Sequence, residues 1–356
     1  MARLTLLRTP TIGPISFAQL IGRFGSAAAA LDALPGLVRR GGGRVPAIAD
    51  RRVIEAEMTG VAALGARYLF RGEPGYPPLL DQIESAPPAL IVKGDPALLE
   101  GRAVAMVGAR NASANAMRFA RGLAAELGRA GAVVVSGLAR GIDTEAHVGA
   151  LDTGTIAVIA GGIDVVYPPE NARLQAEVAE RGLVVSEQPP GLEPRARHFP
   201  YRNRIIAGIT PGTVVVEAAP KSGSLITARY AAEYGREVMA VPGSPIEPRA
   251  RGCNLLIREG ATLVQDADEV LEALGPIDAR MLAPPAPRFA PAPTSEEPSD
   301  GDRRDLIGLL GPVAIPVDEL VRLSGGSPAS VQMVLLELEL AGRLERHAGG
   351  RVALVG

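Results

Sequence analysis

The residues of this sequence best suited to chemistry are basic residues that follow apolar runs. In the stretch EAAPKSGSLITARYAAEYGREVMAVPG, Lys221 and the turn Ser222-Gly223-Ser224 separate a β-branched run (TVVVE) from a helical pattern (SLITARYAAEYG). The first amides of a helix lack internal partners and point at whatever docks there. The stretch therefore predicts an anion site, for a nucleotide, a carboxylate or the phosphates of a polymer.

Other loops of the same kind carry arginine. Arg110 lies in GARNAS (108–113) and Arg140 in SGLARGID (136–143), each after an apolar run. A long loop over 186–204 has four arginines within ten residues that contain no acid: Arg195, Arg197, Arg202 and Arg204. Loops at the carboxyl ends of parallel strands meet at one edge of a sheet, and the planar guanidinium suits phosphate oxygens. We expect one basic rim.

The composition limits what this rim binds. The 356 residues carry a formal net charge of -2 with a pI of about 6.1, so a nucleic-acid site must be a local patch. One cysteine, Cys253, and three separated histidines argue against a disulfide framework and a zinc cluster. No loop reads G-x-G-x-x-G or ends as a phosphate-binding P-loop, so we expect no metal and no nucleotide cofactor. Without an apolar leader or a spanning segment, we expect a cytoplasmic protein with no membrane partner.

The pattern of apolar residues predicts three folded segments and a linker. Residues 1–75 hold short helical patterns with Gly breaks, and 76–275 alternate buried strands with amphipathic helices. The second segment is typical of an α/β fold with a doubly wound, mostly parallel Rossmann-like sheet. Residues 276–300 contain seven prolines and no apolar period, which indicates a Pro/Ala-rich linker. Residues 301–356 predict three helices and a hairpin at Gly349-Gly350, which is a winged helix.

The third helix of this winged helix, SPASVQMVLLELELAG, is a poor candidate for reading DNA. It begins with a Ser327 cap and Pro328, contains Glu337 and Glu339, and has no Lys or Arg up to Gly342. Its apolar residues exceed what one face needs for its own core: Val331, Val334, Leu335, Leu338 and Leu340. We expect the module to serve protein contacts or to dock on the sheet domain, with a weak DNA contact left open at the hairpin.

An ordered series of motifs resembles the DprA (Smf) family of DNA-processing proteins of natural transformation. The series is VGAR, SGLARGIDTEAH, TIAVIAGGIDVVYPPEN, SEQPPG, FPYRNRIIAGIT, EAAPKSGSLITARYAAEYGREVMAVPG and GCNLLIREGA, over about 170 residues. The flanks resemble that family's SAM-like helical domain and winged helix. The resemblance implies a homodimeric protein without enzymatic turnover. It implies binding of single-stranded DNA and loading of RecA onto strands displaced from SSB, which is a further candidate partner.

The resemblance and the residues together give a candidate DNA site. The basic candidates are Arg110, Arg140, Arg202, Arg204 and Lys221, with Ser222, Gly223, Ser224 and Asn203 as hydrogen-bonding partners of the strand. Gly137, Gly161 and Gly162 allow a strand to approach the backbone. Phe199 and Tyr201 are candidates for base stacking, or else pack under the loop. Leu255, Leu256 and Ile257 are candidates for a dimer contact, or else belong to the core.

Two other classes of function compete with this interpretation. The LOG-type phosphoribohydrolases resemble this core but carry a P-G-G-x-G-T-x-x-E loop, and here the position of its catalytic acid is Tyr230. The remaining acids at strand ends are Asp143, Asp164, Glu187 and Glu217, without a paired-carboxylate motif. The third class is an interaction scaffold with an incidental basic rim. A nucleotide-hydrolysis assay distinguishes a phosphoribohydrolase from a DNA-binding protein. A salt titration of DNA binding distinguishes the interaction scaffold from a DNA-binding protein.

Overall fold

The computed structural model describes residues 1–275, 297–347 and 349–355, and it divides the chain into two compact units. We call Glu57–Pro285 the core unit. The end unit combines Met1–Ala56 with Ala286–Gly356, so it joins the two ends of the chain. The division falls inside α4 (Arg51–Ala63). Among the helices of the described ranges, none is long and apolar enough to cross a membrane.

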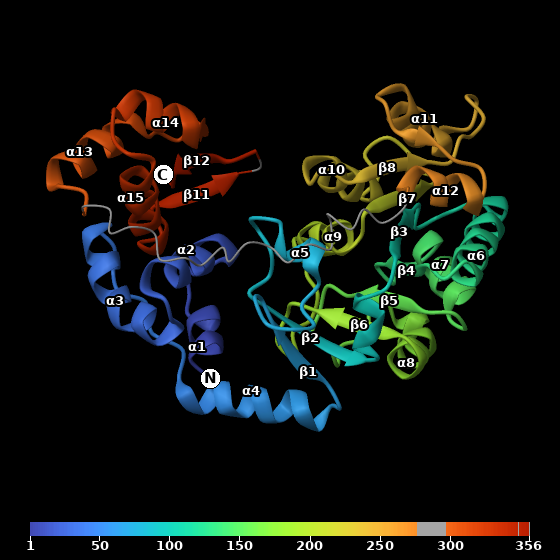
Figure 1. Cartoon of the computed structure of the whole chain (residues 1–356), viewed down its shortest axis with the longest axis horizontal. Coiled ribbons are helices and arrows are strands. Elements are labelled where there is room, and N and C mark those ends of the chain that lie inside the picture. The colour runs from blue at the N-terminus through green and yellow to red at the C-terminus, as the bar shows by residue number, and fades with distance from the viewer. Residues whose placement is uncertain (276–296, 348, 356) are drawn as a thin grey trace. The chain divides into compact units, whose positions relative to one another are not determined.

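The core unit is built on one nine-stranded sheet with the order β1-β2-β6-β5-β4-β3-β7-β8-β9 (Figure 1). Its strands are β1 (Arg67–Phe70), β2 (Ala89–Gly94), β3 (Ala103–Gly108), β4 (Val133–Ser136), β5 (Thr155–Val158), β6 (Leu183–Ser186), β7 (Gly212–Val216), β8 (Glu237–Ala240) and β9 (Thr262–Leu263). The seven strands from β3 to β9 correspond to the predicted apolar runs, and neighbouring ones pair in parallel. The predicted doubly wound, mostly parallel sheet is confirmed.

The sequence did not predict the antiparallel edge of this sheet. β2 pairs antiparallel with β6, for example Ile91 with Ser186, and β1 pairs antiparallel with β2. An antiparallel edge on a parallel sheet is common in folds of this class. Because β1 begins at Arg67, the sheet takes in residues that the sequence assigned to the N-terminal helical segment, 1–75.

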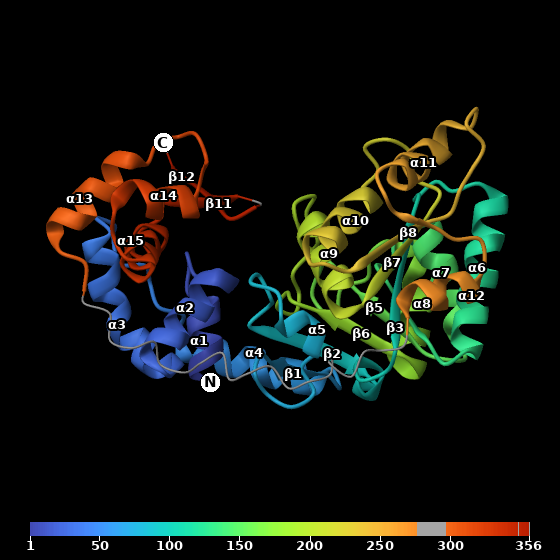
Figure 2. The same ribbon diagram turned by 45° about the horizontal axis from the view of Figure 1, so that its top comes forward.

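Helices cover both faces of the sheet because its strands are apolar on both sides. They are α5 (Pro78–Asp81), α6 (Ala114–Arg129), α7 (Ile142–Ala150), α8 (Ala172–Arg181), α9 (His198–Ile209), α10 (Ser224–Glu233), α11 (Arg251–Arg258) and α12 (Ala267–Leu274). In β3, Val104 and Met106 pack with α6 and α7, while Ala105 and Val107 face the side of α9 and α10. Figure 2 shows these two layers on opposite sides of β3 and β7.

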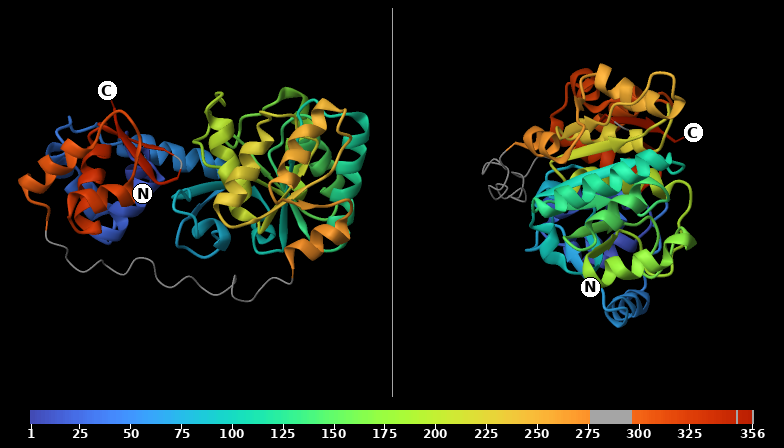
Figure 3. Two further views of the ribbon diagram at one scale, coloured as in Figure 1. Left: turned by 90° about the horizontal axis from the view of Figure 1, so that it is seen from above. Right: turned by 90° about the vertical axis from the view of Figure 1, so that its right-hand side faces the viewer.

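The end unit contains the N-terminal helices and the winged helix. Its elements are α1 (Ala2–Arg8), α2 (Pro14–Phe24), α3 (Ala27–Arg40), α13 (Asp300–Leu309), α14 (Val317–Ser324), α15 (Pro328–Leu340) and the sheet β10 (Ile315–Pro316), β12 (Arg351–Leu354), β11 (Leu344–His347). The Ser327 side chain caps α15 as predicted, accepting from the Ser330 amide. Figure 3 shows the blue N-terminal helices against the red helix α15. Most of the predicted linker, 276–300, lies outside the described residues.

Candidate nucleic-acid interface

The basic loops lie at the point where the strand order of the sheet changes direction. From β3 the chain continues through β4, β5 and β6 on one side, then crosses to β7, β8 and β9 on the other. Arg110 follows β3 and Lys221 follows β7, so they stand on either side of this switch point. Crevices at such points are where open α/β sheets bind ligands.

Two adjoining cavities, of about 190 Å³ and 850 Å³, open at these strand ends. We call them together the strand-end site. Both are lined by Arg110, Ala139, Tyr167, Pro194, Phe199 and Arg202. The smaller also has Gly137, Arg140 and Gly161 in its wall, and the larger has Asn203 and the whole Lys221–Ser224 turn. The structure therefore brings together most of the predicted residues.

Arg202 is the most unusual residue of the strand-end site. Its side chain is only 6% exposed although it lines both cavities, and its Nε has no hydrogen-bond partner in the described part of the chain. Burial lowers the pKa of this guanidinium to about 10, against an opposing effect of Asp143, so it stays charged at neutral pH. A buried cation with unused donors favours an anion in the adjoining cavity.

Gly137 makes the position of Arg202 possible. A Cβ added at residue 137 would lie 1.6 Å from Nη1 of Arg202. The glycine after β4 thus serves the arginine, whereas the sequence suggested that it admits a DNA strand. Gly161 lies on the cavity wall with Pro194 and the Leu192 carbonyl against it.

Arg110 covers an aromatic ring in this structure. Its guanidinium carbon is 5.0 Å from the centroid of Phe199, and the ring of Tyr167 is 5.2 Å from the same centroid. Cations stack on aromatic faces through the ring quadrupole. Phe199 therefore lines the strand-end site with Arg110 over its ring, and stacking of a base on it stays a prediction.

The loop after β7 presents Lys221 to solvent. Lys221 is exposed, has a φ of 71°, and forms no ion pair with another described residue. The hydroxyls of Ser222 and Ser224 are 2.8 Å apart, and Asn203 donates to the Gly223 carbonyl over 3.2 Å. Asn203 thus ties the loop, the alternative that the sequence favoured over a contact to a base. Left-handed backbone at a non-glycine residue is costly and concentrates at functional sites.

Arg140 is at the rim of the smaller cavity. It forms an ion pair of 3.8 Å with Glu170, and both side chains are well exposed. Such pairs contribute little to stability because water screens them. Arg140 is therefore available to exchange Glu170 for a phosphate.

Arg204 is not in the site as predicted, and Tyr201 packs against Arg204, the alternative that the sequence left open, because 198–209 is a helix and not a loop. Arg204 is 2% exposed, donates to both carboxylate oxygens of Glu187 over 2.6 Å, and lies 4.2 Å from the ring centroid of Tyr201. Neither Arg204 nor Tyr201 lines the strand-end site. Arg204 instead joins α9 to Glu187, and Tyr201 packs on the Arg204 guanidinium. Gly162 does not line the cavities either, and the Pro189 carbonyl would lie 2.6 Å from an added Cβ there.

Several residues of the site were not among the sequence candidates for binding DNA, including Tyr167, Arg249 and Asp143, whose charge acts on Arg202. The sequence could have indicated Tyr167, because it lies in the loop after β5, at the carboxyl end of a strand like the basic loops. No sequence pattern indicated Arg249, since the short turn Pro248–Ala250 lies far along the chain from the other loops.

Each acid at the strand ends has a hydrogen-bond partner elsewhere in the fold, Asp164 with the Gly191 amide and Glu217 with the Ser113 amide. Burial raises the pKa of Asp143, and it accepts a hydrogen bond from the Ala139 amide over 3.4 Å. Glu187 is held by Arg204, and Tyr230, at the position of the LOG-type acid, stacks on Tyr234 with centroids 5.8 Å apart. Over the ranges that the structure describes, no three His, Cys, Asp or Glu side chains cluster as metal ligands.

Comparison with known proteins identifies the family. A family profile described as DNA recombination-mediator protein A matches residues 67–275, which is more than half of the chain. The chain belongs to the DprA (Smf) family. Profiles for the DprA-like N-terminal HHH domain and the DprA winged helix domain match 1–60 and 290–350.

Individual DprA and Smf proteins are similar over most of their length. The chain is 40% identical to Protein Smf of Escherichia coli over 282 residues, which is 78% of this chain and 75% of that one. It is 48% identical to the DNA processing protein DprA of Streptococcus pneumoniae over 202 residues, or 55% and 70% of the two chains.

Two solved DprA structures share the fold. The X-ray structure of DprA from Streptococcus pneumoniae superposes with a TM-score of 0.61 at 37% identity, covering 73% of this chain and 86% of that chain. A structure of DprA from Helicobacter pylori superposes with a TM-score of 0.54 at 30% identity, covering 59% and 95%. The latter structure gives insight into a single-stranded DNA binding mode of that protein. A DNA-processing role is therefore supported for the family.

Proposed function

We propose that this chain binds single-stranded DNA by its phosphates at the strand-end site. The observation that carries the proposal is Arg202, a buried guanidinium that lines both cavities beside Arg110 and forms no ion pair with another described residue. Neither guanidinium forms an ion pair within the described ranges, so together they create a local positive field on a chain whose net charge is -2. The single-stranded DNA binding of the similar Helicobacter pylori protein supports this choice of anion.

The residues of the site have separate roles in the proposal. Lys221 and the hydroxyls of Ser222 and Ser224 bind phosphates from one side, with the Gly223 and Ser224 amides at the start of α10. Arg110, Arg202 and, at the rim, Arg140 bind from the other. Phe199 offers a base the part of its ring that Arg110 leaves free, which suits binding without strong sequence preference.

The wider role follows the family. The protein protects incoming strands and helps to load RecA onto DNA covered by SSB, in the cytoplasm, and it catalyses no reaction of its own. We keep the homodimer as part of this proposal, with α11 as the contact. Leu256 and Ile257 pack partly on the core of the core unit, so Leu255, which is not in that cluster, is the better dimer candidate.

The experiment is a fluorescence anisotropy titration of a labelled oligo-dT against salt concentration. Arg110→Ala and Lys221→Ala should each weaken binding and reduce the slope of log K against log salt by about 0.7, the value for one phosphate contact on a single strand. Arg129→Ala is the matched control, because Arg129 is exposed at the far end of α6, about 24 Å along the helix from its start.

Unchanged affinity and slope in both site variants would refute the site. Release of free base from nucleoside monophosphates by the wild-type protein would instead favour the phosphoribohydrolase class. For RecA, the readout is the rate of RecA-dependent ATP hydrolysis on SSB-covered strands, with and without this protein. No acceleration would remove the loading role while leaving DNA binding intact.

A further inference from the structure

Helix α15 of the winged helix is buried on two faces. Val331, Val334, Leu335 and Leu338 pack into the core of the winged helix itself. Met333, Leu336 and Leu340 belong to a different cluster, whose other buried members lie in the N-terminal segment, residues 6–38. The excess of apolar residues in this helix therefore has its partner within the same chain.

The second face has the spacing of a helix that docks on a surface. Met333, Leu336, Glu337 and Leu340 stand at positions i, i+3, i+4 and i+7, which is one stripe of an α-helix. The cluster that receives them includes Phe17 and Leu20 of α2 and, from α3, Leu34 and Leu37. Each of these four is at most 7% exposed.

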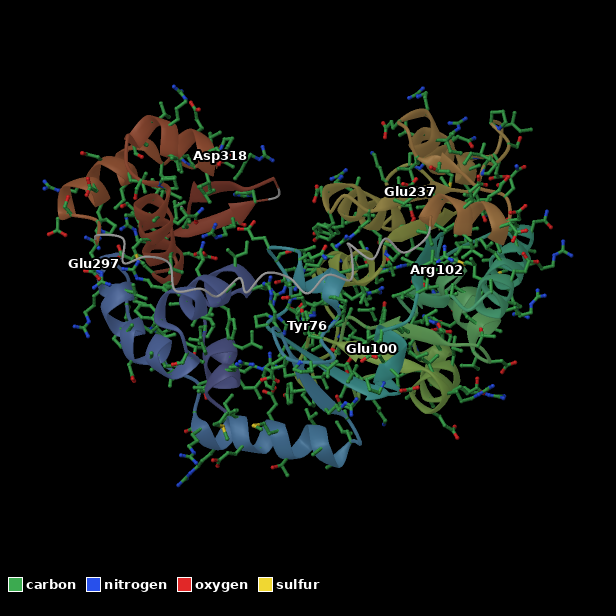
Figure 4. The ribbon with its side chains drawn as sticks, in the orientation of Figure 1. Tyr76, Glu100, Arg102, Glu237, Glu297 and Asp318 are labelled. Atoms are coloured by element: carbon green, nitrogen blue, oxygen red, sulfur yellow. The ribbon has the colours of Figure 1, made fainter. Side chains whose placement is uncertain are left out.

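A buried carboxylate gives this contact its specificity. Glu337 is 1% exposed, and its Oε1 accepts a hydrogen bond from Nε of Arg40 in α3 over 2.7 Å. Arg303 of α13 donates to the other oxygen over 2.8 Å, so Glu337 keeps a partner inside the winged helix when Arg40 is removed. At the edge of the contact Gln19 donates to Gln332 over 2.9 Å, and Glu297, labelled beside α3 in Figure 4, lies 3.9 Å from Arg40.

The backbones approach closely where α3 ends. A Cβ added at Gly41 would lie 2.0 Å from the Glu337 carbonyl oxygen, and one added at Gly43 would lie 2.6 Å from Ala341. Gly41 has ordinary helical dihedral angles, φ -69° and ψ -4°, which any residue adopts. Its lack of a side chain is therefore required by the contact and not by the backbone.

We propose that the face of α2 and α3 is a docking site for one specific helix, α15 of the same chain, and that α15 serves this protein contact and not a DNA groove. The third helix of a winged helix is the element that enters a DNA major groove. Here the stripe Met333–Leu340 is occupied by α2 and α3. This inference is independent of the strand-end site and of the proposed function.

The experiment uses the full chain with a specific protease site inserted between residues 280 and 290, cut after folding. We expect the fragment that contains 297–356 to stay bound and to co-elute with the rest of the protein on gel filtration. Gly41→Ala should release it, because the added methyl group occupies the place of the Glu337 carbonyl. Arg40→Glu should release it as well, because it sets a second carboxylate against Glu337.

Matched controls are available on the same helices. Gly22→Ala adds a methyl group where no atom lies within 4 Å, and Arg39→Glu makes the same charge change one residue before Arg40, at an exposed position. Both should retain the fragment. In the uncut chain, amide hydrogen exchange over 331–340 should be slow in the wild type and both controls, and at least tenfold faster in the two release variants. Separation of the cut wild type, or retention by both Gly41→Ala and Arg40→Glu, would overturn the proposal.

Discussion

Glu217 holds the loop that carries Arg110. Its carboxylate accepts a hydrogen bond from the Ser113 amide over 2.8 Å, and its carbonyl oxygen accepts one from the Ala109 amide over 2.8 Å. Glu217 follows β7 and has a φ of 49°, so the end of one strand clamps both ends of the loop after its neighbour β3. A negative side chain thus positions a cation in a site that we expect to bind an anion.

The hydrogen bond from Ser113 and the negative charge of Glu217 predict opposite effects on DNA affinity when Glu217 is replaced. Glu217→Ala removes the acceptor, frees the Arg110 loop and should weaken single-stranded DNA binding about tenfold, since a charge-assisted hydrogen bond is lost. Glu217→Gln keeps an oxygen acceptor and should bind at least as tightly as the wild type. Anisotropy at one salt concentration measures both. If charge alone mattered, both variants would bind more tightly, and that result would contradict the positioning role.

Arg202 and Arg204 should separate binding from stability, although they stand two residues apart in α9. Arg204→Met leaves Glu187 buried without its partner and should lower the free energy of unfolding by about 3–5 kcal/mol. Arg202→Met removes a cation whose Nε has no partner, so it should cost much less stability while DNA affinity falls. Urea unfolding and anisotropy on the two variants test this. Equal destabilisation by both would show that Arg202 is structural.

Gly137 should be intolerant of a single methyl group. Gly137→Ala places a Cβ against the Arg202 guanidinium and should reduce DNA affinity about as much as Arg202→Met does, on the order of tenfold. The control is Gly122→Ala in α6, where no atom lies within 4 Å and which lines neither cavity. Normal affinity in Gly137→Ala would mean that Arg202 reaches phosphate from another position.

His147 should make the fold less stable in mild acid. It is fully buried, its Nδ1 is 2.7 Å from the Thr155 hydroxyl, and burial lowers its pKa to about 3. The unfolded chain binds this proton near pH 6.5 and the folded chain does not, so stability is complete above pH 6.5 and falls as the pH drops toward 3. The slope is at most about 1.4 kcal/mol per pH unit.

Urea midpoints at pH 7.5, 6.5 and 5.5 measure this effect before most carboxylates titrate. His147→Gln, which carries no charge at any of these values, should flatten the dependence. His198→Gln is the control, because His198 is only partly buried at the surface of α9. A wild-type midpoint that does not change between pH 7.5 and 5.5 would contradict the prediction.

The sequence predicted the location of the site better than it predicted the direction of its side chains. Arg110 and Lys221 were found because apolar runs mark strands and ligands bind beyond their carboxyl ends. The prediction for Arg204 was wrong because the arginine-rich stretch has an interior proline and no clean apolar period, which is typical of a loop, while Tyr201 follows its packing alternative. In the helix α9, spacing along the chain decides which side chains face the cavity. The larger cavity is lined by residues at i, i+3, i+4 and i+7: Phe199, Arg202, Asn203 and Ile206.

Other features had no local signal. The apolar surplus of α15 predicted a protein contact, but its partner lies about 300 residues earlier in the chain, and no pattern in α2 or α3 points to it. The charge state of Arg202 depends on burial under neighbouring loops. Such properties arise from tertiary packing between distant segments, which propensity and periodicity do not encode.

The joining of the two chain ends in one unit has a consequence for synthesis on the ribosome. Leu37 leaves the ribosome early, yet the cluster that it belongs to is completed only by Leu340. At about 5–20 residues per second, the apolar face of the first helices waits roughly 15–60 s for its last helix, while the core unit is made and folds between them. During that interval the nascent chain carries an unfinished hydrophobic surface at its leading end, where a chaperone that binds nascent chains would find it.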